Sequence, residues 1–266
     1  MAALTAVFLA VVGAVTVVGL KSRSMGQQVV AEQTLRQGFQ LDPTAMRVPL
    51  IVSAVRSSVV EVCAQSAHGM STGSGIVASD SGLVLTNFHL VARATSAGGI
   101  DVRVAGEQEN RHARFVGASF AADLAVVKVD QTRGLTPAPL VNSDRLQVGS
   151  EVIALGSPKA LQETTRLVAV TALHRLITVP PPAFAGEHER RATYRAIQID
   201  TALPARDVAL RRAGSGGGLV DLQGRLVGLR SSLYRPAHGR PAAGQDLALP
   251  INEVERLTAL ATAAYG

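Results

Sequence analysis

The chain has 266 residues, of which 47% are apolar and 17% charged, so most of its length cannot be disordered. Aromatic residues make up only 3% and tryptophan is absent, so Val, Leu, Ile and Ala must build the core, which favours many strands. The net charge of +6 comes from scattered arginines without aromatic interleaving, and we therefore expect no nucleic-acid partner. The single cysteine, Cys63, cannot form an internal disulfide or a zinc cluster, and we expect a small buried side chain there.

The first predicted element is an uncharged apolar run over residues 2–20. A helix of this length would extend about 28 Å, close to the thickness of the hydrocarbon core of a bilayer. No positive segment precedes the run and no convincing cleavage site follows it, so it predicts a membrane anchor rather than a cleaved signal peptide. Lys21 and Arg23 follow directly, and the positive-inside rule would hold that flank in the cytoplasm.

The next elements are a short polar helix or linker over 27–39 and a short helix over Val48–Arg56. From there the pattern shortens to strands separated by turn signals. The predicted strands fall into two groups of six: 58–64, 74–78, 83–87, 100–105, 113–117 and 124–129, then 151–155, 164–173, 192–199, 218–221, 225–230 and 246–249. The segments 179–191 and 234–244 are rich in turn residues and are predicted to be exposed or mobile loops.

Short, regularly spaced strands without amphipathic helices between them predict an all-β fold. The connection over 131–149 contains two prolines and divides the strands evenly, so two six-stranded antiparallel barrels fit the pattern, preceded by the N-terminal transmembrane helix. The predicted organisation is a membrane anchor over 1–23, a linker or short helix over 24–47, a first barrel over 48–140 and a second barrel over 141–266.

Three residues occur in an order that suggests nucleophilic hydrolysis. His89 ends a predicted strand, Asp123 precedes a continuous apolar strand, and Ser215 lies in the glycine-dense turn Ala213–Leu219. Such a hydrolase needs a hydroxyl, a base beside it and a carboxylate that orients the base. Each residue alone has an ordinary structural interpretation, but the combination within one β-rich chain is much more specific.

The segments around these residues resemble those of trypsin-like serine peptidases of the HtrA/Deg type. The resemblance extends from about Val48 to Glu253 and rests on matching segments at 73–77, 82–89, 123–129, 143–158, 197–202, 215–217 and 247–252. It implies two perpendicular β-barrels with the active site in the cleft between them. His89 and Asp123 would come from one barrel and Ser215 from the other.

The resemblance also implies a role for each residue. Ser215 would attack a peptide carbonyl while His89 takes its proton and Asp123 orients His89. The oxyanion hole would be formed at Ala213, Gly214 and Ser215. Arg230, Ser231 and Ser232 look like the edge that pairs with the main chain of a polypeptide substrate, although an ordinary strand end explains them equally well.

The segment before Ser215 departs from the family pattern. The family usually has Gly-Asn directly before its serine, whereas this chain has Ala213-Gly214 and extra residues around Ala205–Arg212. We therefore expect an adjustable loop at Ala205–Ala213. The predicted function is a membrane-anchored serine endopeptidase acting on misfolded or regulatory proteins, and the alternative is a catalytically silent homologue that binds extended polypeptide.

The remaining expectations concern partners and placement. The six histidines are dispersed without a ligand-like spacing, so the sequence predicts no metal and no cofactor. About 14 residues follow Pro250-Ile251-Asn252, too few for the PDZ domain that many relatives carry. The resemblance implies a catalytic domain outside the cytoplasm, in the periplasm, and allows a homotrimer, as relatives are often trimers.

Overall fold

The computed structural model describes residues 43–67, 69–94, 99–104, 107–156, 165–180, 193–200, 215–237 and 245–265. The anchor predicted over 2–20 and the polar segment predicted over 27–39 lie outside these ranges. Among the described residues, no helix is both long and apolar enough to span a membrane. The chain divides into two units, Met1–Met46 and Arg47–Gly266, and the fold and site described below belong to the second.

The short helix predicted over Val48–Arg56 is present as α2 (Pro43–Val55), followed by the 3-10 turn η1 (Arg56–Ser58). Its apolar side chains recur at helical spacing and pack on the large core cluster below them, namely Val48, Ile51, Val52 and the buried Val55. The helix ends where the chain turns into the first strand.

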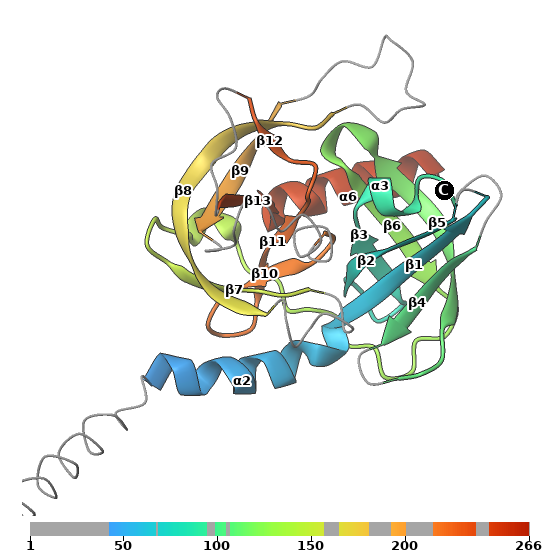
Figure 1. The fold of residues 1–266 in the computed structure, drawn as a ribbon, viewed down its shortest axis with the longest axis horizontal. Helices are drawn as coiled ribbons and strands as arrows, with labels where there is room; N and C mark the ends of the chain where they lie inside the picture. The colour runs from blue at the N-terminus through green and yellow to red at the C-terminus, as the bar shows by residue number, and fades with distance from the viewer. Residues whose placement is uncertain are drawn as a thin grey trace, which may run out of the picture. The chain divides into compact units, whose positions relative to one another are not determined.

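The first lobe is a closed barrel of six antiparallel strands, as predicted (Figure 1). Its strands are β1 (Val59–Ser66), β2 (Gly69–Val77), β3 (Leu83–Thr86), β4 (Ile100–Val104), β5 (Arg111–Ser119) and β6 (Leu124–Val129), paired in the order β1-β2-β3-β6-β5-β4. Valines from every strand except β5 fill the interior together with Ala, Ile, Leu and Phe side chains. A core of β-branched residues compensates for the absence of tryptophan, because their stiff side chains pack well on pleated strands.

The second lobe is a seven-stranded antiparallel sheet, one strand more than predicted. Its strands are β7 (Glu151–Ala154), β8 (Arg166–Thr178), β9 (Thr193–Asp200), β10 (Gly218–Val220), β11 (Leu226–Arg230), β12 (Arg235–Pro236) and β13 (Gln245–Pro250). They follow the order β12-β8-β7-β10-β11-β13-β9, and an additional pairing of β8 with β9 joins six of them in a ring. The extra strand, β12, lies in the segment 234–244 that we predicted to be a mobile loop.

Two further expectations need correction. The C-terminal helix α6 (Ile251–Tyr265) was not predicted, and it crosses from the second lobe to pack on β5 and β6 of the first (Figure 1). Val254, Leu257 and Ala261 form its buried face at helical spacing. Cys63 is half-buried rather than buried, because the first four residues of β1 are enclosed and exposure begins at Cys63, toward the end of the strand.

Candidate active site

His89 lies in the one-turn helix α3 (Phe88–Val91), not at the end of a strand as predicted. The helix begins directly after β3, so the chain turns sharply and brings His89 toward Asp123. The backbone N–H of His89 donates to Asp123 Oδ1 at 2.9 Å, and the ring Nδ1 lies 2.8 Å from Asp123 Oδ2. The side chain of His89 is 26% exposed, so its ring can be reached from solvent.

Asp123 occupies the left-handed region of backbone conformation, with φ 51° and ψ 38°. It follows the 3-10 turn η2 (Phe120–Ala122) and directly precedes β6. Its carbonyl accepts hydrogen bonds from Phe88 N at 3.1 Å and from Asn87 Nδ2 at 3.0 Å. These bonds tie the turn before β6 to the turn after β3 and fix the aspartate beside the histidine.

Ser215 begins the described part of a glycine turn that leads into β10 and is completely buried as a residue. Its carbonyl accepts a hydrogen bond from Ser74 N of β2 at 2.8 Å, which joins the second lobe to the first. The next residue, Gly216, has a φ of +77°, and a Cβ atom there would collide with the backbone oxygen of Ser74. Glycine is therefore required for both conformation and space.

The three predicted residues converge where the two lobes meet. Ser215 Oγ lies 3.4 Å from His89 Nε2, on the opposite side of the ring from Asp123. The same hydroxyl donates to Ser232 Oγ at 3.1 Å and accepts from Ser232 N at 3.0 Å. The proton of Ser215 thus faces two acceptors, His89 and Ser232, and in this conformation the shorter bond is to Ser232.

The strand end Arg230-Ser231-Ser232 is tied to internal partners rather than left open. Arg230 is buried and forms an ion pair with Asp246 of β13 at 2.5 Å. Ser231 Oγ donates to Asp123 Oδ2 at 2.5 Å. The aspartate therefore accepts bonds from both lobes, and the structure gives Ser231 a contact that the sequence did not indicate.

Tyr234 is the residue at this site that sequence reasoning missed altogether. It is 2% exposed, and its hydroxyl donates to the carbonyl of Ala122, directly before Asp123, at 3.0 Å. Burial and the neighbouring Asp123 carboxylate raise the pKa of Tyr234 well above its usual value, so the phenol stays protonated. Its rarity, as one of three tyrosines in the chain, was the only available signal.

The remaining predicted residues, Ala213 and Gly214, lie outside the described residues. The N–H of Gly216 donates to the carbonyl of Arg230 at 3.1 Å, so this N–H already has a hydrogen-bond partner within the fold.

Nowhere in the described part of the chain do three or more His, Cys, Asp or Glu side chains gather as metal ligands would. The three converging residues offer a hydroxyl, an imidazole and a carboxylate.

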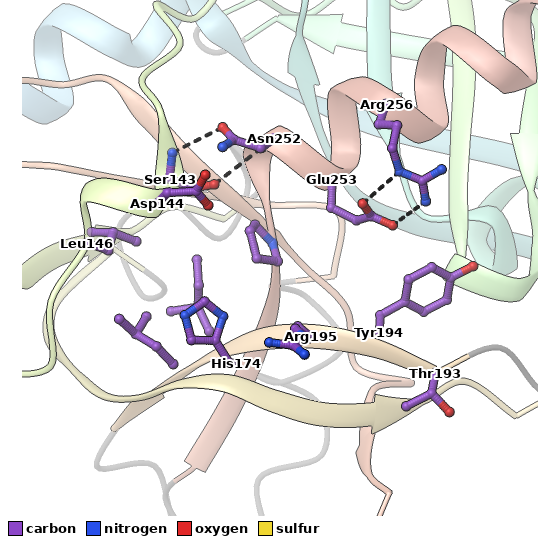
Figure 2. Close-up of a pocket in the computed structure, with 13 residues that line it drawn as sticks. Ser143, Asp144, Leu146, His174, Thr193, Tyr194, Arg195, Asn252, Glu253 and Arg256 are labelled. Atoms are coloured by element: carbon purple, nitrogen blue, oxygen red, sulfur yellow. Dashed lines mark hydrogen bonds and ion pairs between the residues drawn. The ribbon is translucent and has the colours of Figure 1, made fainter.

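A pocket of about 520 Å³ lies elsewhere, between the β8–β9 hairpin and the start of α6 (Figure 2). None of the three converging residues lines it. His174, which has a φ of 55° at an irregularity in the β8–β9 pairing, faces it together with Arg195, while Glu253 and Arg256 pair at its edge. The pocket is thus distinct from the hydroxyl–imidazole–carboxylate site.

The known proteins to which this chain is similar are peptidases. A family model described as a trypsin-like peptidase domain matches residues 73–229, which include all three converging residues. The periplasmic serine endoprotease DegP of Escherichia coli strain K12 is 32% identical over 190 residues, covering 71% of this chain and 35% of DegP. The serine protease PepD of Mycobacterium tuberculosis is 33% identical over 221 residues, covering 79% of this chain and 45% of PepD.

A solved structure shows the same fold. The active form of the Rv3671c protease from M. tuberculosis aligns with a TM-score of 0.65 and 22% identity, covering 82% of this chain and 86% of that chain. The chain spans less than half the length of the curated relatives DegP and PepD. Since the family model covers more than half of the sequence, the chain belongs to the family of trypsin-like peptidase domains and is a homologue of the DegP-type serine proteases.

Proposed function

We propose that this chain is a serine endopeptidase that hydrolyses peptide bonds of polypeptide substrates with His89, Asp123 and Ser215. The observation that carries the proposal is the chain of contacts Asp123–His89–Ser215, with heavy-atom distances of 2.8 and 3.4 Å, built from two lobes. This is the order of contacts that a hydroxyl nucleophile, its base and an orienting carboxylate require. The names of the relatives DegP and PepD support the same activity.

The geometry supports a defined order of proton transfers. The Nδ1–H of His89 donates to Asp123 Oδ2, which leaves the lone pair of Nε2 directed toward Ser215. Nε2 takes the hydroxyl proton as Oγ attacks the peptide carbonyl, and it returns this proton to the leaving amine when the C–N bond breaks. Water then attacks the acyl-enzyme by the same route in reverse, releasing the acid and restoring Ser215.

The 3.4 Å separation between Ser215 Oγ and His89 Nε2 fits a resting enzyme. Catalytic hydrogen bonds are often long without substrate and tighten in the Michaelis complex. For Ser215 to react, its hydroxyl must rotate from Ser232 Oγ toward the imidazole. The oxyanion of the intermediate would be held by the N–H groups of Ser215 and Ala213, the arrangement implied by family membership.

One observation favours a second candidate function, a catalytically silent domain that binds extended polypeptide. Ser232 contacts the Ser215 hydroxyl twice, and both contacts are shorter than that to His89. A serine held permanently in this way would not attack a carbonyl. The two candidates differ in whether Ser215 reacts.

Covalent labelling separates the two candidates. The full chain, in mild detergent, is treated with a fluorophosphonate probe and separately with casein, as wild type, Ser215→Ala and the exposed control Ser81→Ala. If the chain is a peptidase, the probe labels the wild type and Ser81→Ala, and both cleave casein. Ser215→Ala is neither labelled nor able to cleave casein. Wild-type protein that binds denatured casein but neither labels nor cleaves would establish the silent domain instead.

We also propose that residues 2–20 anchor the chain in a membrane with the peptidase domain outside the cytoplasm. The uncharged run supports the anchor, and the periplasmic relative DegP supports the side. Alkaline phosphatase fused after Gly266 should be active in cells, whereas β-galactosidase at the same point should not. The reverse pattern would place the domain in the cytoplasm, as Lys21 and Arg23 alone suggest.

A further inference from the structure

The turn that presents Asp123 is held in an unfavourable backbone conformation. The left-handed region is unfavourable for residues other than glycine, although aspartate tolerates it better than most. Such a conformation persists only where its surroundings determine it. The residues that hold this turn therefore decide where the carboxylate points.

The first lobe holds one side of the turn. Phe88 N and Asn87 Nδ2 both donate to the carbonyl of Asp123, and Asp123 N donates to the carbonyl of Phe120. These bonds secure the peptide that follows Asp123 and close η2. The peptide that precedes Asp123 is held only at its N–H by these bonds, and its carbonyl, that of Ala122, accepts from the second lobe.

The second lobe holds that carbonyl through Tyr234. The hydroxyl of Tyr234 donates to it at 3.0 Å, and both Tyr234 and Ala122 are buried, so water cannot take over the bond. The phenol remains a donor because burial and the Asp123 carboxylate raise the pKa of Tyr234. A residue that only filled the core would need the ring but not the hydroxyl.

The same segment reaches the carboxylate itself, through the bond from Ser231 Oγ to Asp123 Oδ2. Ser231 and Tyr234 follow β11, and β12 then pairs with the end of β8, which fixes the segment on its far side. We propose that Tyr234 is a positioning residue, whose hydroxyl bond to Ala122 fixes the left-handed turn so that the Asp123 carboxylate meets His89. This inference rests on the proposed function for its effect on rate, but not for its effect on geometry.

The test is Tyr234→Phe in the full chain, which keeps the ring and removes the hydroxyl. We expect kcat on a peptide substrate to fall about tenfold, with KM within twofold of wild type. A misplaced orienting group reduces the stabilisation of the transition state but leaves substrate binding unchanged. The low-field proton resonance of the His89 Nδ1–H, assigned by its loss in His89→Ala, should move upfield in Tyr234→Phe. Ser143→Ala is the control, because it removes another buried hydroxyl, one that accepts from Asn252 N and touches none of the three site residues.

The possible outcomes are distinguishable. A thermal midpoint lowered as in Ser143→Ala, with kcat and the resonance both at wild-type values, would overturn the inference and leave Tyr234 a structural residue only. If the wild type neither labels nor hydrolyses, the proposed function fails, and the resonance alone decides whether Tyr234 positions Asp123. A resonance that moves in Tyr234→Phe and not in Ser143→Ala supports the inference in either case.

Discussion

Asp123 and Ser215 both stand at sharp turns that lead into a strand, yet the two turns are secured by different means. The turn at Ser215 is made by glycine, since Gly216 adopts a φ of +77° against the backbone of Ser74, where no side chain fits. The turn at Asp123 places a carboxylate-bearing residue itself in the left-handed region and is held by hydrogen bonds from both lobes. One turn depends on space and the other on bonded partners, so the two should fail differently when altered.

The largest effect is expected for Asp123→Asn, which changes the contact between the hydrogen-bonded turn at Asp123 and His89. The asparagine amide would donate to His89 Nδ1 and force the ring proton onto Nε2, which could then no longer accept from Ser215. We expect kcat to fall about 10⁴-fold, with folding little changed. Steady-state kinetics and thermal unfolding of the full chain measure both quantities.

The exposed residue Asp130 provides the control for this charge change. Asp130→Asn should keep wild-type kinetics. An Asp123→Asn variant that retains more than a tenth of wild-type kcat would show that Asp123 does not orient His89.

The second effect concerns the turn that depends on space. Gly216→Ala adds a methyl group against the carbonyl of Ser74 in an unfavourable conformation, and we expect the free energy of unfolding to fall by about 3 kcal/mol and probe labelling to be lost. Gly149→Ala is a matched control, because Gly149 has a φ of +89° but nothing within 4 Å of the added atom. It should lose about 1 kcal/mol and keep labelling. Equal losses in urea unfolding would show that the Ser74 carbonyl imposes no steric limit.

The contrast between the two turns also explains what the sequence could predict. The residue pattern located β6 at its observed bounds and the other five barrel strands approximately, because alternation and turn residues are local signals. The glycine turn and the three site residues were likewise visible as motifs. The pattern missed β12, which has two residues and exists only through its pairing with β8.

The contacts that secure Asp123 could not be read locally. Tyr234 and Ala122 are 112 residues apart, and Ser231 and Asp123 are 108 apart, so both bonds depend on how the lobes dock. Placing His89 in α3 depended on the bonds from Phe88 N and His89 N to Asp123, which no strand pattern encodes. The helix α6 was missed although its buried residues recur at helical spacing, because the predicted elements ended with the strand over 246–249.

A smaller effect should separate two neighbouring serines, Ser231 and Ser232. Ser231→Ala removes a donor from the buried carboxylate of Asp123 and should lower kcat about tenfold. Ser232→Ala removes the competing acceptor of the Ser215 proton and should raise the rate of fluorophosphonate labelling about threefold. Labelling kinetics of the two variants, side by side, give the sign of each effect. A slower Ser232→Ala would mean that Ser232 assists Ser215 instead of holding it at rest.

The smallest effect is a pH dependence of stability that arises from the bonded turn. The fold keeps Tyr234 neutral, with its pKa raised above the ordinary value of about 10, whereas the unfolded chain ionises there. The contribution of Tyr234 is therefore complete below pH 10 and is lost as the pH rises, because the unfolded state releases a proton that the folded state retains. At pH 10.5 the wild type should have lost about 1 kcal/mol through this group, and Tyr234→Phe should have lost none of it. The urea midpoints of both proteins at pH 9 and pH 10.5 measure the difference. Parallel declines in the wild type and in Tyr234→Phe would mean that Tyr234 ionises equally easily in the folded and unfolded chains. That result would contradict a buried phenol that donates to Ala122.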